Sequence, residues 1–380
     1  MLTYSILIFI IALVLVCYST QKVIYVANKK HLFDEPTEDR KIHLVRTPNL
    51  GGVAIFASLM FTFFLFLPYT SITNLNYIIA SSVIMFIIGL TDDLVGVNPT
   101  KKMLAQLIVA LIIAGPAGFR ITSFYGFMGF NEIPFALSIT GSVLFIMYLI
   151  NAFNLIDGIN CLAGSIGLLT CAMFAYFFWT LNETGFSFLA IAMCGCLAGF
   201  LWYNRTPAKI FMGDTGSLFL GFMVAIFSIR FMELSHSNAV KNTGVTFSSA
   251  PMLVYALLMI PVFDTFRVFT LRLLKKKSPF AADRNHIHHR LVDLNLSHMQ
   301  ATLVLVVTNV IALGIVFSLG KFGNEVIFVA LSGFIVFSNW VLCHRFTQKS
   351  NKPPKTSPTY PNLLPTSQKK RTARELTPLS

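Results

Sequence analysis

Long apolar stretches recur along the whole sequence, and they constrain its fold more than any other feature. Eleven of them stand out, at about residues 2–19, 51–68, 77–91, 102–118, 135–151, 159–180, 185–203, 216–233, 250–271, 299–318 and 325–343. Most are long enough to cross a bilayer as α-helices, which satisfy their own backbone hydrogen bonds in hydrocarbon. The sequence therefore predicts an all-α, polytopic integral membrane protein with about eleven transmembrane helices.

Composition excludes a soluble globular domain. Hydrophobic residues make up 55% of the chain, charged residues make up 12%, and the mean hydropathy is +0.70, which leaves too little polar surface for a water-soluble fold. The six cysteines fall in or beside apolar stretches and include no Cys-x-x-Cys pair. We interpret them as small apolar side chains and not as a disulfide framework or a zinc site.

Lysine and arginine are distributed unevenly over the connecting segments. If the N-terminus is outside, the segments that fall inside hold 24 of the 29 Lys and Arg residues. The positive-inside rule then predicts an outer N-terminus, a cytoplasmic C-terminus and a basic cytoplasmic face, suited to anionic head groups and phosphorylated substrates. Nucleic-acid binding is not expected, because no basic stripe is interleaved with aromatic residues on a soluble element.

Two regions of the chain differ in character. Residues 1–346 are predicted to form the transmembrane domain, and the first apolar stretch is its first helix, because it lacks the charged start of a secretory signal. Residues 347–380 carry six prolines and seven Lys or Arg. Such a composition predicts a disordered cytoplasmic tail without catalytic residues.

Two adjacent carboxylates, Asp92 and Asp93, stand at the end of the apolar stretch 77–91, in a chain with only 16 acidic residues. Charge at the edge of hydrocarbon is costly, so an acidic pair placed there predicts a functional site. The alternative interpretation is that both residues only end a helix and face water.

Two further polar clusters lie at span ends on the same predicted side. Asn154 and Asp157 are spaced i, i+3 and would offer an amide oxygen and a carboxylate to one cation; a helix end with a turn at Gly158 is the alternative. Asp214 lies between two glycines just before the eighth stretch. It would serve either as a helix N-cap or as a ligand of Mg²⁺ shared with substrate phosphates.

A basic segment, Asp39 to His43, precedes the second stretch, which opens with Pro48 and the pair Gly51 and Gly52. A helix start that includes glycines exposes backbone N–H groups that favour phosphate. A tight turn entering the membrane needs the same residues and remains an alternative.

The last cluster joins the ninth stretch to a long inner loop. Asp264 and Arg267 are spaced i, i+3, so an intrahelical ion pair is one interpretation of them. The loop contains three histidines in four residues, within the segment His286 to Arg290. No cysteine accompanies them, so we favour phosphate binding, with His as a proton donor, over a zinc site. A solvated basic loop is the alternative.

Six ordered motifs between about residues 39 and 290 make the sequence resemble the polyprenyl-phosphate N-acetylhexosamine-1-phosphate transferases. These membrane enzymes are related to the phospho-MurNAc-pentapeptide translocase. The motifs are Arg40-Lys41-x-His43 with Pro48, Gly51 and Gly52; Thr91-Asp92-Asp93; Asn154-Leu-Ile-Asp157-Gly158; Met212-Gly-Asp214-Thr-Gly-Ser217; Asp264-Thr265; and His286-Ile-His288-His289-Arg290. The last two are similar to the branch that uses UDP-GlcNAc or a similar UDP-sugar.

The resemblance implies a reaction and its reactants. A sugar 1-phosphate, most simply GlcNAc-1-phosphate, would pass from a UDP-sugar to undecaprenyl phosphate at the cytoplasmic face of the cell inner membrane. UMP would be released, Mg²⁺ would be required with Mn²⁺ as an alternative, and lipid-linked synthesis of a cell-surface glycan would begin. A homodimer is an assembly that the resemblance allows.

The resemblance also implies roles for individual residues. Asp214 and Asn154 would bind the metal. Catalysis would involve Asp92, Asp93, Asp157 and Asp214, with the first two activating the lipid phosphate or helping to hold the metal. Substrate binding would involve Lys41, His43, Asp264, His286, His288, His289 and Arg290. Direct attack by the lipid phosphate is favoured over a covalent aspartyl intermediate because it needs fewer steps.

Two positions depart from the family pattern. Asn160 and Cys161 stand where members commonly have Asp and Gly, and Asn49 stands where many have Arg. A pentapeptide translocase-like enzyme and a secondary transporter are the competing functions. A transporter is expected to carry its charges at mid-span, whereas the polar motifs here cluster at span ends on one side.

Overall fold

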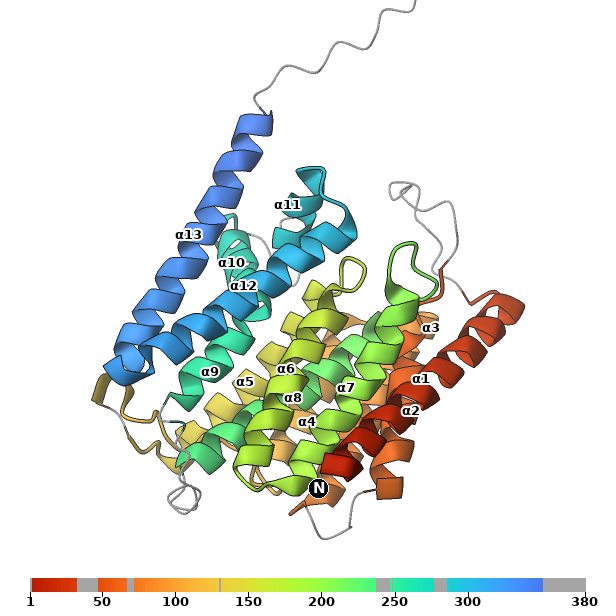
Figure 1. The fold of residues 1–380 in the computed structure, drawn as a ribbon, viewed down its shortest axis with the longest axis horizontal. Coiled ribbons are helices and arrows are strands. Elements are labelled where there is room, and N and C mark those ends of the chain that lie inside the picture. The colour runs from red at the N-terminus through yellow and green to blue at the C-terminus, as the bar shows by residue number, and fades with distance from the viewer. Residues whose placement is uncertain are drawn as a thin grey trace, which may run out of the picture.

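The computed structural model describes residues 2–32, 47–66, 72–129, 131–236, 247, 249–276 and 286–350, the last five by their backbone only. Helices form nearly all of these residues (Figure 1). They are α1 (Leu2–Lys30), α2 (Gly51–Phe66), α3 (Leu75–Val95), α4 (Pro99–Ala114), α5 (Phe135–Ile156), α6 (Leu162–Thr180), α7 (Thr184–Asn204), α8 (Gly213–His236), α9 (Ala250–Leu257), α10 (Met259–Leu274), α11 (Ile287–Asp293), α12 (His298–Leu319) and α13 (Asn324–Ser350), with short 3₁₀ turns at Phe127–Gly129 and Gly320–Phe322. The all-α prediction is confirmed, since the paired extended backbone among the described residues is one isolated bridge, Ser123 to Glu132.

Each predicted span has a helical counterpart, but the helices differ in length. Among the described residues, 8 helices are long and apolar enough to cross a membrane, or 9 if the bent pair α9 and α10 counts as one. The other two counterparts, α2 and α4, have 16 residues each. The membrane character of the fold is therefore established, and the count of eleven stays a prediction. Helix α13 continues to Ser350, and the rest of the predicted tail, 351–380, lies outside the described residues.

Helix α8 is the buried centre of the bundle. Every residue from Thr215 to Ile229 is buried, and α2, α3, α5 and α6 pack against this helix. A helix that is apolar on all sides can face either lipid or other helices in a membrane, and the burial of α8 shows that helices surround it. The start of α8, where Asp214 lies, is thus held at a fixed place among the ends of its neighbours.

Glycines let α2 and α3 approach the start of α8 at backbone contact. A Cβ atom on Gly52 would lie 2.0 Å from the backbone nitrogen of Gly216, and one on Gly89 would lie 2.6 Å from the Cα of Thr215. The Gly52 N–H donates to the Met212 carbonyl at 2.8 Å, and the Gly51 N–H donates to that of Phe211 at 2.9 Å. These two N–H groups, which the sequence suggested for phosphate, are therefore occupied by the protein backbone.

The ninth predicted span is broken between α9 and α10, which meet at an angle of 71°. Pro261 explains the break, because it has no N–H for the Leu257 carbonyl four residues earlier and its ring would clash with that carbonyl. Asn309 of α12 replaces the missing bond: its Nδ2 donates to the Leu257 carbonyl at 2.8 Å, and its Oδ1 accepts from the Ile260 N–H at 3.3 Å. The bend turns α10 towards α11.

Candidate functional site

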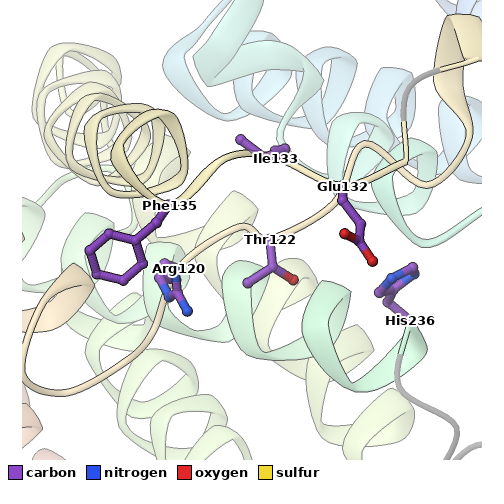
Figure 2. Close-up of a pocket in the computed structure, with 6 residues that line it drawn as sticks. All are labelled: Arg120, Thr122, Glu132, Ile133, Phe135 and His236. Atoms are coloured by element: carbon purple, nitrogen blue, oxygen red, sulfur yellow. The ribbon is translucent and has the colours of Figure 1, made fainter.

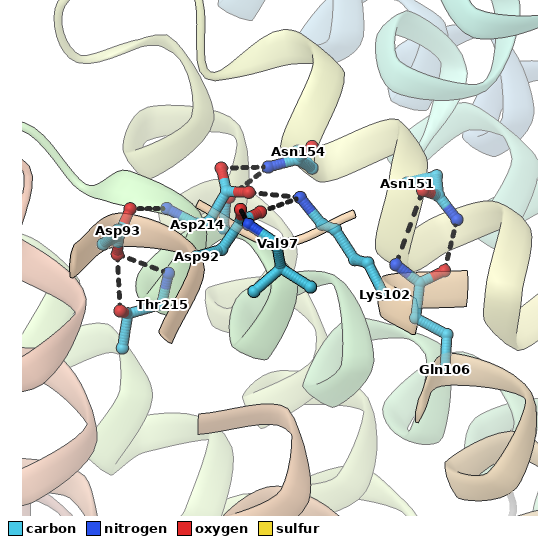
Figure 3. Close-up of polar contacts among 10 residues, drawn as sticks. Asp92, Asp93, Val97, Lys102, Gln106, Asn151, Asn154, Asp214 and Thr215 are labelled. Atoms are coloured by element: carbon cyan, nitrogen blue, oxygen red, sulfur yellow. Dashed lines mark hydrogen bonds and ion pairs between the residues drawn. The ribbon is translucent and has the colours of Figure 1, made fainter. Parts of the chain in front are cut away.

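Three charged side chains from three helices meet at the start of α8 (Figure 3). Lys102 Nζ, in the first turns of α4, lies 3.0 Å from Asp92 Oδ2 at the end of α3 and also contacts Asp214 Oδ2 of α8. All three side chains are largely enclosed, with 14%, 17% and 30% of their surface exposed. Two carboxylates thus converge on one point, and a cation lies between them.

Asn154 completes this cluster from the end of α5. Its Nδ2 donates to Asp214 Oδ1 at 2.8 Å and to Ser217 Oγ at 3.0 Å. The structure therefore places Asn154 and Asp214 in contact, which is the pair that the sequence suggested for a metal. We call Asp92, Lys102, Asn154 and Asp214 the acidic centre.

Asp93 points away from Lys102 and holds the first turn of α8. Its Oδ1 accepts from the Asp214 N–H at 2.8 Å, and its Oδ2 accepts from the Thr215 N–H at 2.9 Å and the Thr215 Oγ1 hydroxyl at 2.5 Å. Carboxylates are favoured at helix N-termini because they accept from N–H groups without an intrahelical partner. The N-cap role that the sequence allowed for Asp214 is therefore filled by Asp93.

Asp157 ends α5 next to the acidic centre, and its N–H donates to the Asn154 carbonyl at 3.3 Å. Burial and the neighbouring carboxylates of Asp214 and Asp93 raise the pKa of Asp157 well above its usual range. The next residue, Gly158, lies against His288: a Cβ atom on this glycine would be 2.3 Å from His288 Nε2. The histidine segment thus contacts the Asn154 to Gly158 motif at its last residue.

The segment His286 to Arg290, which forms the start of α11, is the histidine helix, and Asp264 of α10 anchors it. Asp264 Oδ2 lies 2.8 Å from His286 Nδ1, and Asp264 Oδ1 accepts from the Ile287 N–H at 3.0 Å. The intrahelical pair also forms, with Arg267 Nη2 at 3.1 Å. Asp264 is only 1% exposed. Its contacts are those of a residue that positions the histidines, and its role in substrate binding stays a prediction.

His288 does not suit the proton-donor role that the sequence suggested. It is 1% exposed, and burial, together with the neighbouring His289, lowers its pKa to about 3. A histidine with that pKa is neutral near pH 7 and carries no extra proton. His289 and Arg290 are more accessible, and the His288 and His289 rings lie 4.3 Å apart between centroids.

Some predicted residues cannot be placed. Lys41 and His43 lie outside the described residues, as does the part of the inner loop from 277 to 285. The site as described therefore consists of the acidic centre, Asp157 and the histidine helix.

Sequence reasoning missed Lys102 and the amide pair behind it. Lys102 was counted only as a positive charge of a loop, because the span was expected to begin there. Helix α4 begins three residues earlier, at Pro99, where Asn98 accepts from the Thr100 N–H at 2.9 Å. One turn after Lys102, Gln106 exchanges hydrogen bonds with Asn151 of α5, at 2.6 and 3.5 Å (Figure 3).

The carboxylates of Asp92 and Asp214 fit a hard divalent cation, and Asn154, whose Nδ2 now donates to Asp214, would offer its oxygen in the opposite amide orientation. Carboxylate and amide oxygens are the ligands that Mg²⁺ prefers, and the Lys102 ammonium shows that a cation is stabilised between Asp92 and Asp214. Within the described part of the chain, no group of three or more His, Cys, Asp or Glu side chains could hold a metal ion. Substrate oxygens and water would have to complete the coordination, as is usual for Mg²⁺.

A second cavity, of about 320 Å³, lies at the other ends of α5 and α8. It is lined by Arg120, Thr122, Glu132, Ile133, Phe135 and His236 (Figure 2). Phe135 begins α5 and His236 ends α8, whereas the acidic centre lies at the end of α5 and the start of α8. This cavity contains none of the predicted site residues and is separate from that centre.

Comparison with known proteins agrees with this arrangement. Residues 75–232 match the family described as glycosyl transferase family 4. A probable undecaprenyl-phosphate N-acetylglucosaminyl 1-phosphate transferase of Bacillus subtilis (strain 168) is 32% identical over 337 residues, or 87% of each chain. The chain belongs to glycosyl transferase family 4.

Other relatives of this glycosyl transferase family 4 chain carry similar names. A decaprenyl-phosphate N-acetylglucosaminephosphotransferase of Mycobacterium tuberculosis (strain ATCC 25618 / H37Rv) is 28% identical over 312 residues, 77% of each chain. An undecaprenyl-phosphate alpha-N-acetylglucosaminyl 1-phosphate transferase of Salmonella typhimurium is 29% identical over 301 residues, 76% of this chain and 77% of the relative. The family match spans the whole acidic centre, and the histidine helix follows it in the chain.

Proposed function

We propose that this chain transfers N-acetylglucosamine 1-phosphate from a UDP-sugar to undecaprenyl phosphate at the cytoplasmic face of the membrane. UMP would be released, and lipid-linked synthesis of a surface glycan would begin. The names of the relatives support the sugar phosphate and the polyprenyl phosphate. The observation that carries the proposal is the enclosed meeting of Asp92, Lys102 and Asp214 at helix ends, where charged phosphates would be brought together.

The reaction joins two anions, so positioning and charge compensation dominate its catalysis. An oxygen of the polyprenyl phosphate attacks the phosphorus that carries the sugar, and the bond from that phosphorus to the UMP oxygen breaks. Lys102 compensates phosphate charge, and Asp92 activates the lipid phosphate by accepting its proton. Asp93 keeps the start of α8, and hence Asp214, in place. We favour this direct attack over an aspartyl intermediate.

Asp214 and Asn154 would hold Mg²⁺, with Mn²⁺ as an alternative. When bound, the metal would neutralise charge on the phosphates and orient them. Lys102 would then move from its place between the carboxylates towards substrate phosphate. Asp157 and the exposed side of the histidine helix, His289 and Arg290, would contact the nucleotide sugar, with Asp264, His286 and His288 setting the position of that helix.

The placement in the membrane is part of the proposal. We propose eleven spans, with the short helices α2 and α4 included, an outer N-terminus and a cytoplasmic C-terminal tail, in a multi-pass protein of the cell inner membrane. Under this topology the acidic centre and the histidine helix lie at the cytoplasmic surface, where both UDP-sugars and lipid phosphate are accessible. A homodimer is compatible with this placement.

The direct test supplies membranes containing the protein with labelled UDP-GlcNAc, undecaprenyl phosphate and Mg²⁺. We expect labelled lipid and equimolar UMP, and we expect both to disappear on metal chelation. Asp214→Asn should abolish both products while the protein remains in the membrane. Glu183→Gln, which breaks an ion pair with Arg230 at 2.6 Å, is the control that should stay active. Flux of UDP-sugar across the membrane without UMP would instead identify a transporter.

A further inference from the structure

A cavity of about 350 Å³ lies between α10, α12 and α13 and reaches the histidine helix at Ile287. Its walls are mainly apolar and include Ile260 of α10, Leu305 of α12, Ile335 of α13 and Ile287 of α11. The volume is at the lower end of the range for ligand sites, about 300–1,000 Å³. This space, which we call the α12–α13 crevice, suits part of one hydrocarbon chain.

One end of the crevice is basic. Val341 and Leu342 line it, and Cys343, the next residue of α13, accepts from Arg290 Nη1 at 2.8 Å. His344 and Arg345 follow on α13 and are exposed. The nearby short helix α11 contributes one carboxylate, Asp293, at its end. Among the described side chains the rim thus carries more positive than negative charge.

An exposed tryptophan at this rim suits the level of lipid head groups. Trp340 is 59% exposed and stacks on His344, with 5.7 Å between ring centroids. Tryptophan is enriched at the boundary between hydrocarbon and head groups. Asn339, one residue before, lines the crevice, and its Oδ1 is buried and accepts no hydrogen bond from the described residues. The crevice therefore has mainly apolar walls and one polar, cationic end.

We propose that an anionic phospholipid binds the α12–α13 crevice, with one acyl chain in the cavity and its phosphate at the basic rim. Basic pockets between transmembrane helices recognise anionic head groups in this way. The polyprenyl phosphate is a less suitable occupant, because α11 intervenes: Ile287 lines the crevice, whereas the next residue, His288, lies against Gly158. A phosphate at this rim would be separated from the acidic centre by the histidine helix.

Occupation of the crevice supports α11 from behind. The side chain of Ile287 contacts the lipid chain, and its N–H is held by Asp264 at 3.0 Å. An acyl chain would therefore favour the position of α11 in which His288 covers Gly158. The effect on transfer rests on the proposed function, whereas lipid binding itself does not.

The first experiment measures retained lipid by native mass spectrometry of the purified full-length chain after exposure to phosphatidylglycerol. We expect the wild type to retain one phosphatidylglycerol, in preference to phosphatidylcholine. Ile335→Trp, which fills the crevice, and Arg345→Gln, which removes rim charge on an exposed side chain, should lose it. Val336→Trp is the matched control that should keep the lipid, because the Val336 side chain on the same helix is 57% exposed. Equal retention by all four proteins, or no retention by the wild type, would overturn the proposal.

The second experiment compares transfer rates in phosphatidylcholine vesicles with and without phosphatidylglycerol. We expect the anionic lipid to raise the wild-type rate at least about fivefold, the lower range of measured couplings between sites. Arg345→Gln should lose this stimulation and keep the rate seen in phosphatidylcholine. If Ile335→Trp instead raises the KM for polyprenyl phosphate, the crevice holds the substrate chain and the proposal is wrong. Absence of transfer in every membrane would refute the proposed function. The lipid-retention experiment would still show whether an anionic lipid binds the crevice.

Discussion

Replacing Gly52 with alanine should disturb the acidic centre without altering any of its side chains. The added methyl group would lie 2.0 Å from the Gly216 nitrogen and 2.5 Å from its Cα. Backbone atoms cannot rotate away as a side chain does, so α2 must separate from the first turn of α8, which carries Asp214. Overpacking of this kind costs about 1–3 kcal/mol, and we expect the upper end of that range.

The same displacement should reduce the rate more than the stability. A shift of about 1 Å in a positioning group can cost about 100-fold in rate. Transfer of label from UDP-GlcNAc is measured in membranes, and thermal unfolding is measured in detergent. Gly141→Ala in α5 is the control, because nothing lies within 4 Å of its added Cβ. Alanine in a helix should raise the free energy of unfolding by about 0.5–1 kcal/mol relative to glycine. Wild-type rate and Tm in Gly52→Ala would refute the close-contact argument.

Three further predictions concern Gln106, Asn160 and His288. Gln106→Leu removes both hydrogen bonds between Gln106 and the Asn151 amide, which keeps only its bond to the Met147 carbonyl at 2.8 Å. The free energy of unfolding should therefore fall by about 1–3 kcal/mol, and an unchanged Tm would contradict this. Asn160, 3% exposed, donates from Nδ2 to Thr206 Oγ1 at 2.9 Å, away from the acidic centre. Asn160→Asp should therefore lower Tm by burying a charge and should not raise the transfer rate. His288 stays neutral when folded, whereas the unfolded chain takes up a proton below about pH 6.5, so stability should fall as pH drops from 6.5 towards 3. The loss is up to about 1.4 kcal/mol per pH unit, and His288→Gln should reduce this slope in pH-dependent unfolding.

Much of the architecture could be predicted because membrane helices are recognisable in a sequence by their length and apolar content. The polar motifs stand at helix ends, and the structure brings Asp92, Asn154 and Asp214 together there. The number of residues between them does not give their distance in space. Only the prediction that all three lie on the same side of the membrane indicated that they meet.

Two details of the site could not be predicted: the directions in which the Asp92 and Asp93 side chains point, and the residue at which α4 begins. Adjacent residues on a helix point about 100° apart, so Asp92 and Asp93 have different neighbours. Asp92 contacts Lys102, whereas Asp93 caps α8. Lys102 was missed because the helix start at Pro99 was placed three residues too late. The bend before α10 did have a sequence signal, Pro261, within a stretch interpreted as one straight span.

The bend between α9 and α10 also bears on how the protein is made. Asn309 supplies the hydrogen bonds of the broken backbone, yet the ribosome synthesises it only after α9, α10 and α11. An unpaired carbonyl is costly in hydrocarbon, so we expect α10 to reach its final position only once α12 has been inserted. Because Asp264 of α10 anchors the histidine helix, a nascent chain that stops before α12 would contain the acidic centre but no ordered histidines. Activity would thus be withheld from every chain that stops before α12.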